Sequence, residues 1–337
     1  MLVEATGIGA GASGRNSGAV QHPFDPVLAP LHRRTLEVYR QLSYDDFVFP
    51  DDPAGLLLLT DDLDAAAARI AEIRDTESSL APELLDEAAL GQLEPMLADG
   101  FAAIRLATGH PIPPDAATRA LGARARGAGA EVRIGQPVVE VSERGATLTD
   151  GTRITADNVL VAAGHWAPEL VEPAGAWRPI RPTYGVTLQV ELEAPPASIL
   201  EEGAAHTVNR PVADDEPETG LITFSMVSVG GLSTVGSTFL SVAPEPATMA
   251  PALLAHGARF VPALRNAAIL RSRVCARPQS IDGRPLIGPV PGREHLFVAA
   301  GHGPWGISTG PASAELAVAA ILDDAVVPPE LEASRML

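Results

Sequence analysis

The sequence predicts a mixed α/β and α+β fold, in which a nucleotide-binding α/β domain is interleaved with an antiparallel-sheet domain. Three observations predict it. Short apolar strands alternate with Ala- and Leu-rich helices at both ends of the chain. The segments 184–193, 206–212, 221–229 and 232–240 instead alternate between apolar and polar residues, as antiparallel strands do. The chain has 337 residues, which is enough for two domains.

The elements follow from periodicity and from turn residues. Asp150 and Gly151 predict a hairpin turn, and Asp115 is expected to cap a helix that ends near Gly127. Helices are expected at 31–42, 62–80, 86–97, 115–126, 250–260 and 307–322. The remaining strands are expected at 2–4, 56–60, 131–134, 138–142, 146–149, 159–163, 271–277, 286–287 and 296–300.

Composition excludes several classes of partner and site. The formal net charge of −18 disfavours nucleic acid and anionic lipid. Cys275 is the single cysteine, so no intramolecular disulfide is possible, which fits a cytoplasmic protein. The sequence contains neither an apolar run that could span a bilayer nor a secretory signal. No zinc-binding pattern of histidines or cysteines is present, and no metal is expected.

Lysine is absent, because all 24 basic residues are arginine. This excludes pyridoxal phosphate enzymes, which need a lysine Schiff base, and P-loop ATPases, whose motif contains lysine.

A glycine-rich stretch follows the first short strand. Residues 9–14 match the pattern G-x-G-x-x-G, but the residues that follow have no helical apolar stripe, and Pro23 and Pro26 stop any continuation. An NAD-dependent dehydrogenase built on this stretch is therefore disfavoured. We interpret Leu2–Glu4 as the second strand of a dinucleotide-binding fold, whose closing acid, Glu4, would accept hydrogen bonds from the adenosine ribose.

The segment from Glu4 to Ala19 resembles the loop after the second strand in the D-amino-acid oxidase superfamily of FAD enzymes, which includes glycine oxidase, sarcosine oxidase and D-amino-acid dehydrogenase. The resemblance implies a Rossmann-like FAD-binding domain. It also implies a first strand, glycine loop and helix of about 30 residues that would precede Met1. The residues that match the pyrophosphate and flavin loop are Ala12, Ser13, Gly14, Arg15, Asn16, Ser17 and Gly18.

Two further blocks support the same resemblance. In residues 156–167 an apolar strand ends in a small-residue turn, where Ala163 and Gly164 would approach the dinucleotide and Trp166 would pack nearby. Val138 stands where the family contacts adenine through its backbone.

The third block covers residues 277–311 and resembles the C-terminal motif of the family. Its glycines would bring the start of the last helix to the flavin, where free N–H groups stabilise the reduced, anionic ring. The cofactor-binding residues expected here are Gly301, Gly303, Gly306, Ile307 and Ser308.

The resemblance implies oxidation of an amine or amino acid by hydride transfer to the flavin. The expected catalytic residues are Tyr184, Arg277 and His302, and His22 is a further candidate for the same cavity. Trp305 stands where glycine oxidase carries an arginine-bearing turn, which indicates a bulkier or more apolar substrate. FAD is expected to be non-covalent, because Cys275 lies inside a predicted strand.

Absence of lysine predicts a dehydrogenase that passes electrons to an acceptor other than oxygen, since sarcosine oxidase-like enzymes use a lysine to promote the reaction with oxygen. An oxidase that uses His302 or water is the alternative. A degenerate relative that binds no FAD is a second alternative. The FAD-binding domain is expected to comprise residues 1–42, 130–180 and 271–330, and the substrate domain residues 43–129 and 181–270.

Overall fold

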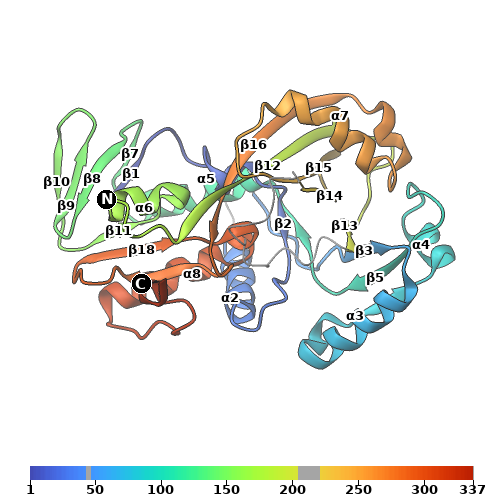
Figure 1. Cartoon of the computed structure of the whole chain (residues 1–337), viewed down its shortest axis with the longest axis horizontal. Coiled ribbons are helices and arrows are strands. Elements are labelled where there is room, and N and C mark those ends of the chain that lie inside the picture. The colour runs from blue at the N-terminus through green and yellow to red at the C-terminus, as the bar shows by residue number, and fades with distance from the viewer. Residues whose placement is uncertain (43–46, 204–220, 337) are drawn as a thin grey trace.

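The computed structural model describes residues 1–42, 47–203 and 221–336. Two lobes lie side by side, and the long strands β12 (Ile180–Glu191) and β16 (Ile269–Ser280) run from one to the other (Figure 1). The strand expected at 206–212 lies outside the described residues. Within those residues, no helix combines the length and the apolar character needed to cross a bilayer.

The first lobe contains two parallel strand pairs, and a third parallel pair, β13 (Ile199–Glu202) with β3 (Leu56–Thr60), lies in the second lobe. Strand β1 (Leu2–Glu4) pairs with β7 (Val132–Ile134), and β11 (Val159–Val161) pairs with β18 (Leu296–Ala300). The other strands of this lobe are antiparallel: β17 (Leu286–Pro289) beside β18, and the three-stranded sheet of β8 (Val138–Ser142), β9 (Gly145–Leu148) and β10 (Arg153–Thr155).

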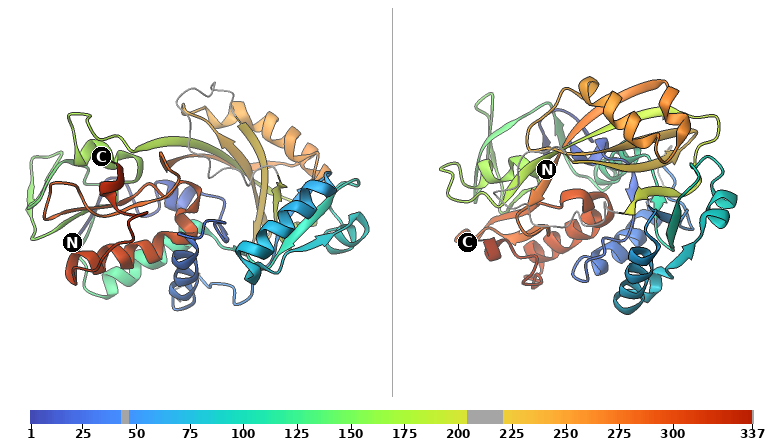
Figure 2. Two further views of the ribbon diagram at one scale, coloured as in Figure 1. Left: turned by 60° about the horizontal axis from the view of Figure 1, so that its bottom comes forward. Right: turned by 45° about the vertical axis from the view of Figure 1, so that its right-hand side comes forward.

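Helices surround these strands. Helix α2 (Ala29–Arg40) packs against α8 (Gly306–Leu322), as both views of Figure 2 show. The one-turn helix α1 (Ala12–Arg15) packs against α5 (Pro114–Gly127), and α6 (Ala167–Val171) packs near β8 and β11.

The second lobe is built on one eight-stranded sheet in the order β16-β12-β15-β14-β13-β3-β5-β4. Helix α7 (Pro246–Gly257) covers one face of its first strands, and α3 (Leu63–Thr76) and α4 (Glu87–Leu93) lie at the other end. The other strands are β15 (Leu232–Phe239), β14 (Leu221–Val229), β13 (Ile199–Glu202), β3 (Leu56–Thr60), β5 (Ala102–Leu106) and β4 (Glu83–Leu85), with the short pair β2 (Ala19–Val20) and β6 (His110–Pro111) beside the sheet.

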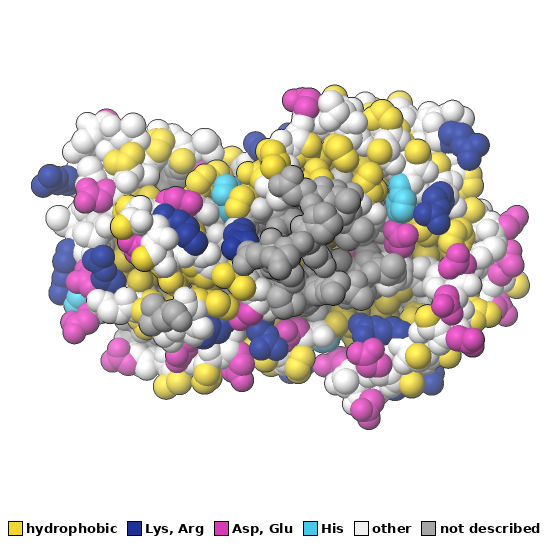
Figure 3. Space-filling model, in the orientation of Figure 1, with side chains coloured by type: hydrophobic (Ala, Val, Ile, Leu, Met, Phe, Trp, Pro, Cys, Tyr) yellow, Lys and Arg dark blue, Asp and Glu magenta, His cyan; other side chains and the backbone are white. Residues whose placement is uncertain are grey.

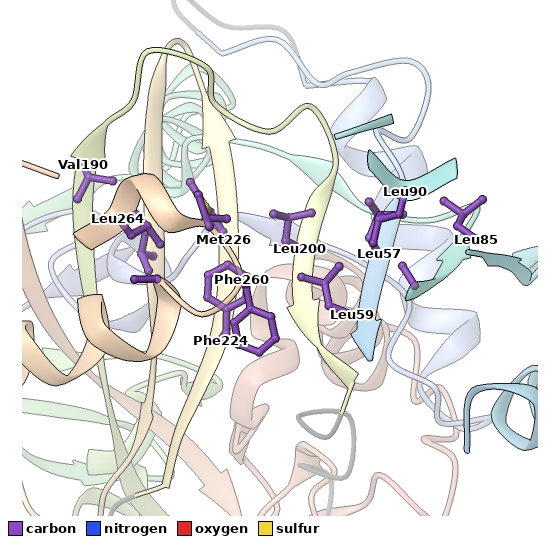
Figure 4. Close-up of a cluster of buried hydrophobic side chains, with 14 residues drawn as sticks. Leu57, Leu59, Leu85, Leu90, Val190, Leu200, Phe224, Met226, Phe260 and Leu264 are labelled. Carbon is purple, nitrogen blue, oxygen red and sulfur yellow. The ribbon is translucent and has the colours of Figure 1, made fainter. Parts of the chain in front are cut away.

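The core of this lobe explains the run of four leucines in β3. Successive side chains of a strand point to opposite faces. Leu57 and Leu59 pack with Phe224 and Phe260 on the α7 side (Figure 4), whereas Leu56 and Leu58 pack with the α3 side. Because both faces are covered, all four leucines are buried, and each contributes about 2 kcal/mol to stability.

The mixed architecture confirms the predicted fold class, with local corrections. Asp115 does not cap α5: Pro113 holds that position, and the Asp115 carboxylate accepts a hydrogen bond from Arg119 at 2.9 Å inside the first turn. The helix expected at 62–80 stops at Thr76 and is followed by a short 3₁₀ helix at Ser78–Leu80. Helix α4 ends at Leu93, before the expected boundary.

Acidic side chains are spread over the surface, and several gather over α3 and α4 (Figure 3). Many are paired with arginine, as Glu72 is with Arg69 at 2.6 Å. Solvent screens such exposed pairs, so each contributes little to stability.

Candidate functional site

Three glycine-rich turns, far apart in the sequence, converge on strand β16. The first contains α1, the second contains the 3₁₀ helix η2 (Gly164–Trp166) after β11, and the third contains the 3₁₀ helix η5 (Gly303–Trp305) after β18. All three pack against β16. The sequence blocks at 4–19, 156–167 and 277–311 are therefore brought to the same strand.

Glu4 ends β1 and begins the first turn. Its Oε1 atom accepts hydrogen bonds from the backbone N–H groups of Thr6 at 2.9 Å and Gly7 at 3.3 Å. Its backbone carbonyl accepts from the N–H of Gln136 at 3.1 Å, two residues before Val138. Glu4 and Val138 are thus brought close together, and the second carboxylate oxygen of Glu4 makes no hydrogen bond within the described residues.

Asn16 holds the first turn in shape. Its side-chain amide donates to the carbonyls of Ala12 and Ser13 at 3.0 and 2.9 Å, and its side-chain oxygen accepts from Gly18 N–H at 2.9 Å. These bonds end α1 after one turn. The Asn16 side chain therefore stabilises the backbone of the loop. Its place in the motif did not reveal this structural role.

The glycines of this turn differ in what surrounds them. A Cβ atom at Gly14 would overlap the carbonyl of Gly9, so Gly14 is needed for the loop to close on itself. At Gly7 and Gly11 nothing lies within 4 Å of the Cβ position. Arg15 is exposed and makes no salt bridge within the described residues. The turn therefore offers open backbone and a free cation, which suit a phosphate.

The second turn is also open. Gly164 has φ of 60° and nothing within 4 Å of its Cβ position, and Ala163 precedes it at the N-cap of η2. Trp166 is 58% exposed, and its ring lies 3.7 Å from that of His165. Trp166 was expected to pack near the dinucleotide, and in the structure its ring contacts the imidazole of His165 on an exposed surface.

The third turn leads into α8. Gly301 and Gly303 have φ of 86° and 54°, and a Cβ atom at Gly303 would overlap the Gln279 side chain. Helix α8 begins at Gly306, so the N–H groups of its first turn have no partner within the helix.

Two residues of that first turn bind other parts of the chain, Ile307 through its backbone carbonyl and Ser308 through its hydroxyl. The carbonyl of Ile307 accepts from the Tyr39 hydroxyl at 3.1 Å, and the Ser308 hydroxyl accepts from Gln21 N–H at 3.0 Å. Ser308 thus ties α8 to the end of the first glycine-rich turn by its side chain.

His302 lies between Gly301 and Gly303, and its backbone forms an isolated β-bridge with Gln279. Burial lowers the pKa of His302 to about 4, and its Nε2 atom is shielded from solvent without a hydrogen-bond partner among the described residues. The imidazole is therefore uncharged at neutral pH, with one ring nitrogen free.

Arg277 is held on β16 by neutral groups. Its guanidinium donates to the Thr238 carbonyl at 2.9 Å and to the Ser237 hydroxyl, and it lies 4.4 Å from the centre of the Phe239 ring. No carboxylate within the described residues pairs with it. Burial lowers the pKa of Arg277, but from so high a starting value that the side chain stays charged.

The expected catalytic residues are only partly brought together. The register of β12 with β16 pairs Thr183 with Arg277 and Tyr184 with Ala276, so the Tyr184 and Arg277 side chains leave opposite faces of the ribbon. His22 is buried, with its Nε2 atom 3.5 Å from a carboxylate oxygen of Glu77 and its ring beside that of His32.

Sequence reasoning missed the residues that hold Arg277, which are Gly185, Ser237 and Phe239. They lie on neighbouring strands and carry no motif. Only the alternation of arginines in residues 271–277 gave a signal, because it marks one face of a strand.

The family assignment agrees with this arrangement. The family described as DAO, FAD dependent oxidoreductase, matches residues 1–320. The chain therefore belongs to the DAO family of FAD-dependent oxidoreductases.

Solved structures share the fold. Glycine oxidase from Geobacillus kaustophilus is 23% identical and superposes with a TM-score of 0.81 over 99% of this chain and 91% of that one. Iminodiacetate oxidase from Chelativorans sp. is 22% identical, with a TM-score of 0.77 over 98% and 91%. L-proline dehydrogenase from P. horikoshii is 19% identical, with a TM-score of 0.80 over 97% and 87%.

The residues present fit FAD. Open backbone at Gly7 and Gly11, the unpaired Arg15 and the free Glu4 oxygen suit the diphosphate and ribose of a dinucleotide. The start of α8 supplies N–H groups and partial positive charge for a reduced ring.

Proposed function

We propose that this protein oxidises an amine that carries a carboxylate, an amino acid in the broad sense, and that Arg277 binds the carboxylate. The observation that carries the proposal is the Arg277 guanidinium, which is partly buried and lacks an acidic partner within the described residues. Desolvating a cation without a counter-ion costs several kcal/mol, and a substrate carboxylate would offset that cost.

The names of the similar structures support this substrate class. Glycine, iminodiacetate and L-proline each contain an amine and a carboxylate. In this chain the guanidinium of Arg277 could bind such a carboxylate, and it lies on the strand that all three glycine-rich turns contact.

FAD, when bound, supplies the acceptor for the hydride that leaves the carbon beside the amine. The residues of the chain orient the substrate. Arg277 fixes the carboxylate, and through it the reacting carbon. His302 is uncharged because burial lowers its pKa to about 4, so it adds no positive charge beside the substrate amine.

We propose that Glu4, Val138, the first glycine-rich turn, the second turn and the start of α8 bind FAD without a covalent bond, as the FAD-binding domain of residues 1–42, 130–180 and 271–330. Cys275 is buried within β16, which supports non-covalent attachment. We further propose that the electron acceptor is not oxygen, since the chain has no lysine to promote that reaction. We propose that Tyr184 belongs to the substrate domain and does not take part in binding the carboxylate with Arg277.

The substrate class is tested by comparing acids with amides. The FAD-loaded protein is mixed anaerobically with a set of amino acids and with the corresponding amino-acid amides, and flavin bleaching is followed at several concentrations. We expect the acids to bleach the flavin at concentrations at least about 100-fold lower than the amides, because a charge-assisted pair is lost. Equal bleaching by the amides would contradict the role of Arg277.

A further inference from the structure

A second cationic group lies on the same sheet face as Arg277. Side chains two residues apart in a strand point to the same face, so Arg271, Arg273, Cys275 and Arg277 form a row along β16. The residues opposite them in β12 are Gln189, Thr187, Gly185 and Thr183, none of which is acidic. The other face of this ribbon is closed by α7 through Val186 and Leu188.

Arg273 is the member of this row whose buried N–H donor lacks a hydrogen-bond acceptor within the described residues. It makes no hydrogen bond or salt bridge within the described residues, and its Nε atom is shielded from solvent. Burial lowers the pKa of Arg273, and the neighbouring Arg271 lowers it further. A charged donor withdrawn from water without an acceptor is costly, so the position favours an anion that the protein itself does not supply.

The charges around Arg273 are predominantly positive. The titratable groups that act on it are Arg271, Asp115, Cys275 and Arg15. Asp115 is the one carboxylate among them, and it is already bound by Arg119 at 2.9 Å. An anion bound by Arg273 would therefore lie in a field to which Arg271 and Arg15 add positive charge and Asp115 adds negative charge.

Thr187 provides a second, independent sign of a ligand. It stands directly opposite Arg273 in the β12–β16 register, it is 5% exposed, and its hydroxyl oxygen has no hydrogen-bond partner in the part of the chain that the structure describes. Nearly all buried hydroxyl groups in proteins are hydrogen-bonded. One carboxylate between the two side chains would accept from both the Arg273 guanidinium and the Thr187 hydroxyl.

We propose that Arg273 and Thr187 form a second anion subsite, which binds the distal carboxylate of a dicarboxylic amino-acid substrate whose first carboxylate is on Arg277. The assignment to a substrate rests on the proposed function, while the subsite itself does not. Residues 273 and 277 are four apart, so their Cα atoms are separated by about 13 Å along the strand. The arrangement therefore selects ligands with acid groups at both ends of a chain of several atoms.

The test measures binding of unreactive acids by calorimetry to the FAD-loaded full chain and to the chain without added FAD. Succinate, adipate and suberate are each compared with the monocarboxylate of the same carbon number. We expect at least one dicarboxylate to bind 10-fold or more tightly than its monocarboxylate, since a second charge-assisted pair is gained. Arg273→Gln and Thr187→Val should each reduce that preference, Arg273→Gln to less than about 2-fold.

Arg105→Gln is the matched control. It is the same arginine-to-glutamine change, made at an exposed position at the far end of the same sheet. It should keep the full preference. Equal binding of mono- and dicarboxylates by the wild type would overturn the subsite, even if the flavin is reduced by monocarboxylic amino acids. The subsite would also be overturned if Arg273→Gln lowered FAD affinity 10-fold and left the dicarboxylate preference intact. That result would assign Arg273 to the cofactor phosphate. Dicarboxylate binding without oxidation of any amine would support the subsite and reject the proposed function.

Discussion

The guanidinium of Arg277 lies directly over Gly185 on the neighbouring strand, in the space that a side chain at residue 185 would fill. Ser237 and the ring of Phe239 hold the guanidinium from the other side. The position of the proposed carboxylate anchor is therefore set by the absence of a side chain on β12.

Replacing Gly185 tests this relationship. Gly185→Ala should displace the Arg277 guanidinium and raise the KM for a carboxylate substrate by about 10- to 100-fold, because hydrogen bonds to a charged group are lost. FAD affinity should not change. Gly91→Ala is the control, since Gly91 lies in α4 with nothing within 4 Å of its Cβ position. An unchanged KM in Gly185→Ala would show that the anchor does not depend on this contact.

Asn16 offers a test of the first glycine-rich turn. Asn16→Ala removes three hydrogen bonds that hold the turn, so FAD affinity should fall about 10-fold or more, while the second lobe keeps its structure. Flavin fluorescence titration measures the change. Asn266→Ala, an exposed change in the second lobe, should leave the affinity as it was. Equal affinity in Asn16→Ala would remove this turn from the cofactor site.

Much of this arrangement follows from sequence, because it depends on local patterns. Strands such as Leu56–Thr60 and Val138–Ser142, and the helix that begins at Gly306, lie where periodicity and glycine predict them. Helix α7 begins at Pro246, four residues before the expected start, because proline suits the first helical position.

The site itself depends on contacts between strands, which local patterns do not encode. Tyr184 and Arg277 were expected to work together, but a register that pairs Tyr184 with Ala276 separates them. Gly185, Ser237 and Thr187 lie near the proposed anion-binding arginines only because β12, β15 and β16 are neighbours. No motif marks these residues.

The choice of electron acceptor is a separate prediction. Because the chain has no lysine, we expect the reduced protein to pass electrons to an artificial acceptor such as a phenazine or a quinone at least about 10-fold faster than to oxygen. Stopped-flow reoxidation, monitored with each acceptor in turn, measures both rates. Oxygen consumption that matches substrate turnover would instead identify an oxidase.

Three buried histidines predict how stability depends on pH. Burial lowers the pKa values of His32, His110 and His302 to about 4, whereas an unfolded imidazole has a pKa near 6.5. Between these values the unfolded chain binds more protons, so stability should fall as the pH is lowered from about 6.5 towards 4. Each histidine contributes on the order of 1 kcal/mol per pH unit in this window.

Thermal unfolding at pH 7 and pH 5 measures the effect. His110→Gln should make the difference in Tm between the two pH values smaller, whereas His295→Gln, in the turn between β17 and β18, is the control that should leave it unchanged. The same pH dependence in His110→Gln and the wild type would contradict this explanation.

The most direct test of the account is the visible absorption spectrum of the protein after loading with FAD and desalting, followed while amino acids are added without oxygen. We expect flavin bands to remain with the protein and then to bleach, because we propose that the three glycine-rich turns that contact β16 bind the cofactor and that Arg277 binds the substrate. A colourless protein after desalting would contradict the cofactor site. Retained bands that no amino acid bleaches would contradict the proposed oxidation.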